Sequence, residues 1–186
     1  MASAGTHLTS LTDLDVHLWS LTRQLFEAVQ FMHDHNVAHM DLKPTNILVP
    51  KTYGRLTIID FGLSVRLGNK TELREGRVGT QGYMAPEVGN GKFSPIRADL
   101  WSVGKVVKDL CMLCRRPSTH RDQLSDVSER LLDDDPRKRP TMSEVLEWML
   151  NLDASEQEQA LTAKVETLRF PKAIIQIIPR PTAIVA

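Results

Sequence analysis

The sequence predicts a mainly α-helical domain with one small β-hairpin, and three patterns lead to that fold class. Apolar residues recur at helical spacing over residues 12–33, and the stretch 95–113 is apolar on several faces, as in a helix that crosses a core. Two short apolar runs, 46–49 and 55–59, flank a turn-forming Pro-Lys-Thr-Tyr-Gly segment and are typical of a hairpin. Because a two-stranded hairpin is marginal alone, we expect it to pack on the helices.

Length and composition favour one folded domain followed by a tail. A chain of 186 residues with 41% hydrophobic residues can bury one core but is short for two. We predict a domain over residues 1–151 and a tail of unassigned structure over 152–186. Within this tail, the polar stretch 153–168 is compatible with a helical extension, and 173–178 is a short β-prone apolar run. The tail is expected either to dock on the domain or to be disordered.

The charge balance and the cysteine count limit which classes of partner and which cellular compartment are expected. The chain has 23 basic and 23 acidic residues, so no global field points to nucleic acid or to an anionic membrane. The amino terminus lacks the basic and apolar regions of a signal peptide, and no run reaches the roughly 18 apolar residues that span a bilayer. Two cysteines without a disulfide framework suit a reducing compartment. We therefore expect an intracellular protein, cytoplasmic or nuclear.

Single residues mark the ends of the expected helices. Thr12 and Asp15 can form a capping box at the first helix, and Thr141 and Glu144 can form another after Pro140. We also expect two shorter helices, over residues 122–132 and 142–151. Residues 63–84 are expected to form a long surface loop. A loop of that length inside a compact domain is normally functional or disordered.

Two short motifs carry the groups that phosphoryl transfer needs. Residues 39–46 read His-Met-Asp-Leu-Lys-Pro-Thr-Asn, and residues 58–62 read Ile-Ile-Asp-Phe-Gly. The reaction requires a carboxylate to receive a hydroxyl proton, a cation beside the moving phosphate and oxygen ligands for magnesium. These groups are supplied by Asp41, Lys43, Asn46 and Asp60. In order and spacing the motifs resemble the catalytic loop and the Asp-Phe-Gly signature of eukaryotic-type serine/threonine protein kinases.

The resemblance implies a role for each matching residue. Asp41 is expected to be the catalytic base, Lys43 to neutralise charge on the transferred phosphate, and Asn46 and Asp60 to hold magnesium, so that Lys43, Asn46 and Asp60 together bind the cofactor. ATP and Mg²⁺ are the implied cofactors. The implied partner is a protein substrate with a serine or threonine hydroxyl, because Leu-Lys-Pro-Thr-Asn is similar to the serine/threonine rather than the tyrosine kinases.

Further residues match the family outside the two motifs. Residues 79–87, Gly-Thr-Gln-Gly-Tyr-Met-Ala-Pro-Glu, resemble the end of a kinase activation segment, in which Thr80 is implied to hydrogen-bond Asp41 and Lys43. The scaffold roles that the resemblance implies fall on His39 at the start of the catalytic motif, the buried pair Glu87 and Arg139, and Asp99, which braces the catalytic loop.

The segment before the catalytic motif departs from the family. The 38 residues that precede His39 contain one glycine, Gly5, and no lysine, so neither the glycine-rich loop nor the nucleotide-binding strand lysine is found there. We expect a kinase-like C-terminal lobe that lacks the N-terminal lobe, with doubtful autonomous activity. The alternative is a catalytically inactive, pseudokinase-like interaction module, whose partner protein covers an exposed apolar surface around Leu48, Leu56 and the start of the chain.

Two other departures concern regulation and substrate recognition. Met40 replaces the arginine that in the family pairs with a phosphate on the activation loop, and methionine cannot form a charge-assisted hydrogen bond. Switching by phosphorylation through this contact is therefore doubtful, and Ser64, Thr71 and Thr80 are the candidate phosphate acceptors of this loop. The stretch from Asp99 to Arg139 is shorter than in most kinases, so the helix that usually helps to dock protein substrates is expected to be abbreviated or absent.

Three groups of residues superficially resemble metal or redox sites. The Cys111-x-x-Cys114 pair lies in an apolar helical run without a second ligand pair, and we interpret it as structural. His33, His35 and His39 are not accompanied by a cysteine or carboxylate that would complete a zinc set. The acidic run 133–135 is interpreted as a turn at a helix end.

Overall fold

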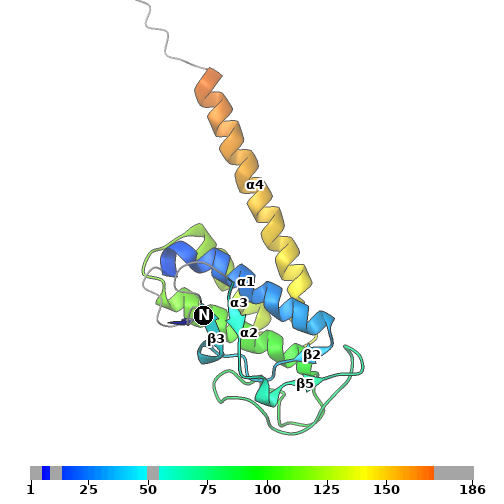
Figure 1. Ribbon diagram of the computed structural model, residues 1–186. Helices are drawn as coiled ribbons and strands as arrows, with labels where there is room; N and C mark the ends of the chain where they lie inside the picture. The colour runs from blue at the N-terminus through cyan, green and yellow to red at the C-terminus, as the bar shows by residue number, and fades with distance from the viewer. Residues whose placement is uncertain (1–5, 9–13, 50–54, 170–186) are drawn as a thin grey trace, which may run out of the picture. The chain divides into compact units, whose positions relative to one another are not determined.

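The computed structural model describes residues 6–8, 14–49 and 55–169. Its described part is dominated by helices, namely α1 (Leu14–Asp34), α2 (Pro95–Leu113), α3 (Thr119–Leu131) and α4 (Met142–Arg169). The chain divides into two compact units, Met1–Met149 and Leu150–Ala186, and the site discussed below lies in the first. Helices α1 and α2 run side by side, and the short strands lie below α1 in Figure 1.

The strands form two small antiparallel sheets. The first has the order β1 (Thr6–His7), β3 (Ile47–Val49) and β4 (Thr57–Ile58), and the second pairs β2 (Val37–Ala38) with β5 (Val65–Arg66). Ile47 lies opposite Ile58, which confirms the predicted hairpin. The other two pairings were not predicted, because two-residue strands are too short to show an alternating pattern.

The predicted apolar stripe of the first helix forms one side of the main core. All five of its residues are buried: Leu18, Leu21, Leu25, Val29 and Met32. Helix α2 crosses the core as expected, begins with Pro95 and is capped by the Ser94 hydroxyl, which accepts from the Arg97 amide. A Cβ added at Gly104 would lie 2.8 Å from the Leu131 Cβ, so only glycine lets α2 approach α3 this closely. The Thr12–Asp15 capping box involves Thr12, which lies outside the described residues.

The second half of the domain is compact. Helix α3 follows α2 after the short connection 114–118, with no further helix between them. The Thr141–Glu144 capping box is confirmed, since the Thr141 amide donates to Glu144 Oε2 at 2.8 Å and the Glu144 amide donates to the Thr141 hydroxyl at 3.3 Å. Helix α4 starts where predicted but continues to Arg169 rather than 151, because residues 152–169 are rich in strong helix formers and contain neither glycine nor proline.

One residue of the expected exposed apolar surface is buried instead. Leu56 is only 8% exposed and belongs to the main core, and Leu48 is half-buried. The amide of Leu56 donates to Gln24 of α1, which holds this end of the hairpin against the helix. The β-prone run 173–178 and the side chains of the first seven residues lie outside the description. Among the described helices, none combines the length and apolarity needed to cross a membrane.

Candidate active site

Three side chains from the catalytic loop and the activation segment close a triangle of hydrogen bonds. We use the name activation segment for residues 63–87. Thr80 Oγ1 donates to Asp41 Oδ1 at 2.6 Å, and Lys43 Nζ donates to Asp41 Oδ2 at 2.7 Å. Lys43 Nζ also donates to Thr80 Oγ1 at 2.8 Å, so each of the three groups contacts the other two. The triangle brings residues 37 positions apart in sequence into one site.

Asn46 completes the surroundings of Asp41. It is the last residue of the 3₁₀ turn η2 (Pro44–Asn46). This turn begins with a proline, whose ring fixes the backbone φ angle at that position. Its Nδ2 donates to the Asp41 carbonyl at 2.9 Å and to Asp41 Oδ2 at 3.3 Å. No described residue donates a hydrogen bond to its Oδ1, so that oxygen is available as a ligand.

The charge state of Asp41 follows from its neighbours. Burial of the carboxyl group would by itself raise the pKa, but the hydrogen bonds from Lys43, Thr80 and Asn46 and the positive charge of Lys43 together outweigh it. The pKa of Asp41 is therefore held below its ordinary value, and the carboxylate is ionised at neutral pH. This is the state in which it can accept a proton.

Asp60 is linked to the same site through the backbone. The amide of Ile59 donates to the Asn46 carbonyl at 2.9 Å, and the Ile59 carbonyl lies 3.0 Å from His39 Nε2. This bond assigns the proton to Nε2, so His39 Nδ1 is free to accept from the Asp41 amide at 3.2 Å. Asp60 itself is exposed and has φ 64°, a left-handed conformation that is costly for a residue other than glycine. Such strain is characteristic of functional positions.

Asp99 fixes the backbone on the other side of Asp41. Its fully buried carboxylate accepts from the His39 amide at 2.7 Å and from the Met40 amide at 2.8 Å. A third contact, from His33 Nε2 at 3.2 Å, was missed by the sequence reasoning, which considered His33 only as a metal ligand. Its spacing from Val29, four residues earlier on the buried stripe, was the signal that could have placed it in the interior.

Glu87 and Arg139 form a bidentate ion pair below the activation segment. The two guanidinium nitrogens lie 2.6 and 2.9 Å from the two carboxylate oxygens, and the Arg139 side chain is fully buried. Arg139 also donates to the Asp133 carbonyl and packs on the Trp101 ring, with 5.0 Å between the guanidinium carbon and the ring centroid. The pair thus joins the end of the activation segment to α2 and to the start of α4.

Tyr83 provides a second tie between the activation segment and α2. Its hydroxyl donates to Asp109 Oδ2 at 2.6 Å. Burial, together with this hydrogen bond and the negative charge of Asp109, raises the pKa of Tyr83 from 10.0 to about 12. Because the pKa is raised in the folded state, the stabilisation is complete below pH 10 and is lost as the pH rises through about 12.

We expect an ultraviolet titration of tyrosinate to show one phenol that ionises at about pH 12, and Tyr83→Phe to remove it. Asp109→Asn should move this transition towards pH 10, because it removes the charge that opposes ionisation. An unchanged transition in Asp109→Asn would mean that Asp109 does not hold the phenol in solution.

The described residues contain no group of three or more histidine, cysteine or acidic side chains that could by themselves hold a metal ion. The three histidines of the sequence cluster contact different partners, since His35 Nδ1 bonds the Phe31 carbonyl. Cys111 and Cys114 are free, and burial raises the pKa of both, for Cys111 to about 11. In the acidic run, the Asp135 amide donates to Asp133 in the turn after α3.

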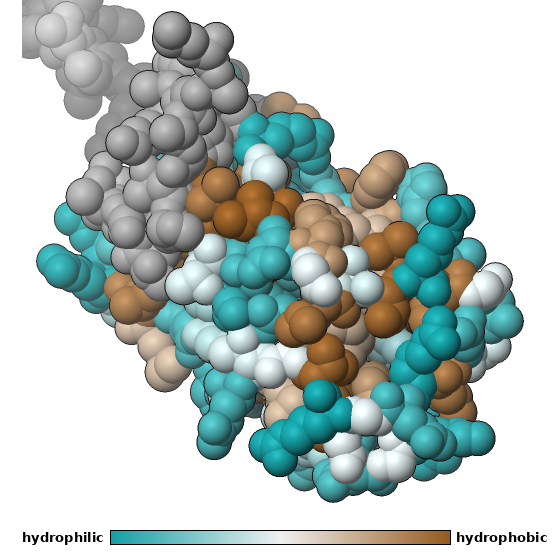
Figure 2. All heavy atoms as spheres, turned by 60° about the horizontal axis from the view of Figure 1, so that its bottom comes forward, coloured by the Kyte–Doolittle hydropathy of each residue, from teal (hydrophilic) through white to brown (hydrophobic). Residues whose placement is uncertain are grey.

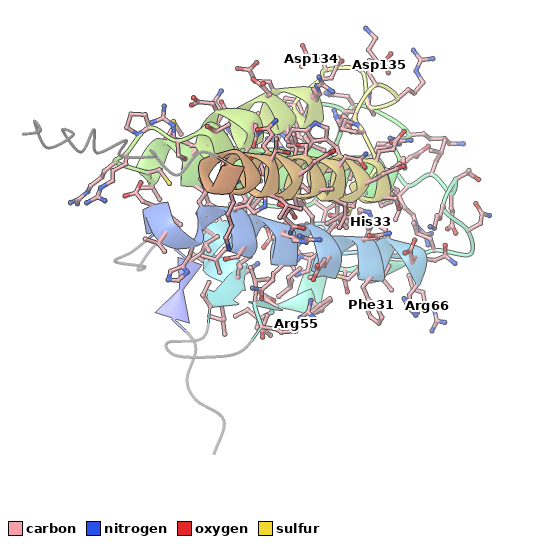
Figure 3. All side chains as sticks on the ribbon, turned by 90° about the horizontal axis from the view of Figure 1, so that it is seen from above. Phe31, His33, Arg55, Arg66, Asp134 and Asp135 are labelled. Atoms are coloured by element: carbon pink, nitrogen blue, oxygen red, sulfur yellow. The ribbon has the colours of Figure 1, made fainter. Side chains whose placement is uncertain are left out.

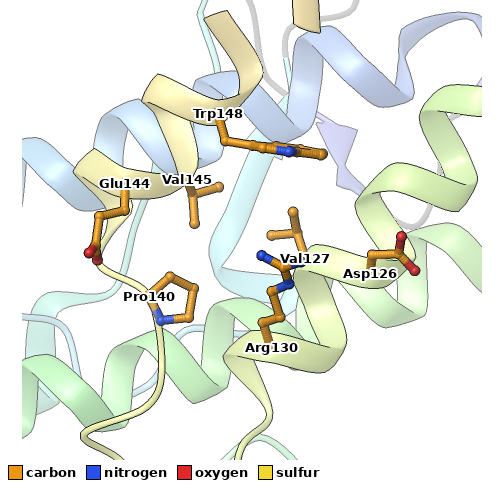
Figure 4. Close-up of a pocket in the computed structure, with 7 residues that line it drawn as sticks. All are labelled: Asp126, Val127, Arg130, Pro140, Glu144, Val145 and Trp148. Carbon is orange, nitrogen blue, oxygen red and sulfur yellow. The ribbon is translucent and has the colours of Figure 1, made fainter. Parts of the chain in front are cut away.

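Two hollows lie outside the triangle. One, of about 320 Å³, opens between α3 and α4, where Trp148 faces Val127 and Arg130 (Figure 4).

The other hollow, of about 760 Å³, lies along α1 beside β4, and we call it the α1 groove. Its exposed apolar rim consists of Phe31 and Phe61, which are 65% and 46% exposed. Figure 3 shows Phe31 and His33 on opposite sides of α1, the first directed outward with Arg55. Apolar side chains gather in several places on the face that Figure 2 brings forward.

The sequence of the chain matches those of known protein kinases. Residues 9–123 match the family model described as protein kinase domain. Myosin light chain kinase 3 of Rattus norvegicus is 45% identical over 97 residues, which are 52% of this chain and 12% of that protein. Calcium/calmodulin-dependent protein kinase cmkA of Emericella nidulans is 33% identical over 168 residues, which cover 73% of this chain and 40% of that protein. Serine/threonine-protein kinase 17A of Oryctolagus cuniculus is 45% identical over 86 residues, 45% of this chain and 21% of that protein.

The chain therefore belongs to the protein kinase domain family, and within it to the eukaryotic-type serine/threonine kinases. It spans less than half the length of each of these relatives. Its mainly helical fold with small antiparallel sheets is consistent with that family.

Proposed function

We propose that this chain carries the phosphoryl-transfer residues of a serine/threonine protein kinase, on a fold that corresponds to the kinase C-terminal lobe over residues 1–151. The observation that carries the proposal is the closed triangle of Asp41, Lys43 and Thr80. A carboxylate, a cation and a threonine that contact one another on a braced loop are what the transfer of a phosphoryl group to a hydroxyl requires. An isolated structural aspartate would need only one of these bonds.

The proposed reaction assigns a task to each side chain. Asp41, ionised because its pKa is lowered, would orient the acceptor hydroxyl of a protein substrate. It would take the hydroxyl proton as the new oxygen–phosphorus bond forms and the bond from the same phosphorus to the bridging oxygen of the leaving ADP breaks. Lys43 lies 2.7 Å from the same carboxylate and places its charge beside the transferred phosphate. Thr80 holds both groups at the distance that lets them act together.

The donor set on the other side of Asp41 fits magnesium. Asn46 Oδ1 and the Asp60 carboxylate are hard oxygen ligands with no hydrogen bond to the described residues, and Mg²⁺ typically takes one or two protein oxygens together with phosphate oxygens and water. When bound there with ATP, magnesium would neutralise charge on the phosphates.

We further propose that a second structural element completes the nucleotide site by covering the α1 groove. Phe61 contacts the His39 ring at a centroid distance of 4.9 Å, and His39 in turn accepts from the Asp41 amide. The groove walls are fixed to each other, since Arg55 is paired with Glu27 and the Leu56 amide donates to Gln24. An element that packs on Phe61 would therefore contact a side of the groove that is linked to the catalytic loop through His39.

The experiment is a titration of the 186-residue chain with MgATP by calorimetry. We expect weak binding of MgATP to the 186-residue chain, with a Kd of about 1 mM, because the contacts assigned to nucleotide and metal in it are few, namely Lys43, Asn46 and Asp60. Asp60→Asn should weaken binding by at least about tenfold, since even outer-shell partners of metal ligands cost 10–100-fold when mutated. Asp134→Asn, an exposed aspartate elsewhere, is the matched control and should bind like the unaltered chain.

Micromolar affinity that Asp60→Asn abolishes would show that the site needs no second element. Equal binding by Asp60→Asn and Asp134→Asn, or none at all, would contradict the assignment of Asp60. Either outcome would favour the second candidate function, that of a non-catalytic interaction module.

The second candidate rests on the exposed rim of the α1 groove. A hollow of this size with exposed aromatic side chains is the kind of surface that proteins cover with a partner. We expect the purified chain to self-associate as concentration rises, and Phe31→Glu to shift sedimentation towards the monomer. Val16→Glu, at a position 76% exposed on the same helix, is the matched control and should not change it. Association that responds equally to both substitutions, or to neither, would remove the support for this surface.

A further inference from the structure

A second apolar cluster lies apart from the main core and joins three segments of the chain. Its buried members are Ala38, Met40, Leu67, Ala85, Val88, Phe93, Ile96 and Ala98. They come from the strand and loop that lead to Asp41, from the activation segment and from the residues around the start of α2. Because the cluster spans these segments, it can transmit the position of one to the others.

Met40 is the member of this cluster that adjoins the catalytic aspartate. Its side chain is 6% exposed, and its amide is held by Asp99 Oδ1 at 2.8 Å. Its backbone is left-handed, with φ 65°, a conformation that is unfavourable for a residue with a Cβ. The left-handed backbone conformation of Met40 is therefore maintained by the contacts around it and not by the intrinsic preference of methionine.

The Met40 carbonyl also fixes the activation segment at the residue before Thr80. A Cβ added at Gly79 would lie 2.8 Å from that carbonyl oxygen, and Gly79 has φ 111°, so only glycine fits this approach. The contact places Thr80 next to the catalytic loop, where its hydroxyl reaches Asp41. Earlier in the segment, Arg74 forms a backbone bridge to Phe93 of the cluster, with both hydrogen bonds at 2.9 Å.

We infer that Met40 is a positioning residue, whose buried side chain anchors the activation segment to the start of α2 and so holds Thr80 against Asp41 without a phosphate group. Three of the polar side chains of the segment already have partners within the protein. Thr71 Oγ1 donates to Asn69 at 2.6 Å, Lys70 bonds Asp34 at 2.7 Å, and Arg74 bonds Glu72 at 2.8 Å. The importance of this anchor for catalysis rests on the proposed function, whereas the anchor itself can be measured without any activity.

The test is hydrogen exchange of the 186-residue chain, followed by mass spectrometry without nucleotide. Met40→Ala removes the anchor without burying a charge, and Met40→Arg buries one. Both should speed exchange over residues 78–88 by at least about tenfold, with α1 unchanged, because loss of a buried side chain weakens the local structure it supports. Met40→Leu should restore slow exchange. Met112→Ala and Met112→Arg, at a position 67% exposed, are the matched controls and should have no effect.

Three results would overturn the inference. One is unchanged exchange over residues 78–88 in Met40→Ala, and another is failure of Met40→Leu to restore it. The third is slower exchange of this stretch in Thr71→Glu, since it would mean that negative charge tightens the segment. Loss of nucleotide binding by Asp60→Asn is measured separately, so a failure of the proposed function and a failure of the anchor are distinguishable.

Discussion

Replacing Arg139 by leucine is expected to lower the free energy of unfolding by about 3–5 kcal/mol. The substitution leaves the Glu87 carboxylate without the cation that now meets both of its oxygens, and a mostly buried charge without a partner is strongly destabilising. It also removes the donors to the carbonyls of Asp133 and Arg97. Urea unfolding followed by tryptophan fluorescence measures the change.

Arg137→Leu is the matched control for this prediction. Arg137 is two residues away, but its side chain is 89% exposed and its ion pair with Asp135 is on the surface. Surface pairs contribute little, so this variant should unfold at nearly the same urea concentration as the unaltered chain. A small loss in Arg139→Leu, no larger than that of Arg137→Leu, would contradict a buried, stabilising pair.

Asp99→Asn is expected to cost about 3 kcal/mol or more, although the side chain barely changes in size. Two backbone amides donate to the two carboxylate oxygens, and hydrogen bonds to charged groups contribute about 1.5–3 kcal/mol each. An asparagine turns one of these acceptors into an NH₂ group that faces a buried N–H. The same loss frees the backbone of His39 and Met40, so nucleotide affinity should fall along with stability.

Asp126→Asn controls for the change of charge alone. Asp126 is exposed on α3, at the rim of the hollow that also contains Trp148, and we expect its replacement to leave stability unchanged. Differential scanning calorimetry of the two variants compares them directly. Equal transition temperatures would show that Asp99 does not brace the catalytic loop.

The long periodic elements and the catalytic loop motifs could be predicted from sequence. The stripe of α1, the apolar faces of α2 and the Thr141–Glu144 box are local patterns, and local patterns determine where helices lie and begin. The contact of Thr80 with Asp41 and Lys43 could be anticipated only through resemblance, because nothing in the local sequence joins residues this far apart.

Features that depend on tertiary packing could not be predicted in the same way. His33 was considered only as a metal ligand, whereas its partner Asp99 lies 66 residues later. Leu56 was expected on the surface, yet the bond from its amide to Gln24 holds it against α1. The exposed aromatic residues that line the α1 groove are Phe31, on a helix, and Phe61, in the Asp-Phe-Gly motif. Met40 was noted for the arginine it replaces, and its apolar cluster became evident only from the fold.

We expect Asp41, Lys43, Asn46 and Asp60 to form one magnesium–nucleotide site, and a paramagnetic metal tests this directly. Manganese accepts the same oxygen ligands as magnesium and broadens nearby nuclear resonances, so titrating the labelled chain with MnATP locates the bound metal. We expect the backbone amide signals of Asn46 and Asp60 to broaden first, and those of Asp126 and Trp148 at the α3–α4 hollow to be unaffected. Broadening that begins at the hollow, or that spares Asn46 and Asp60 at saturating MnATP, would contradict this site.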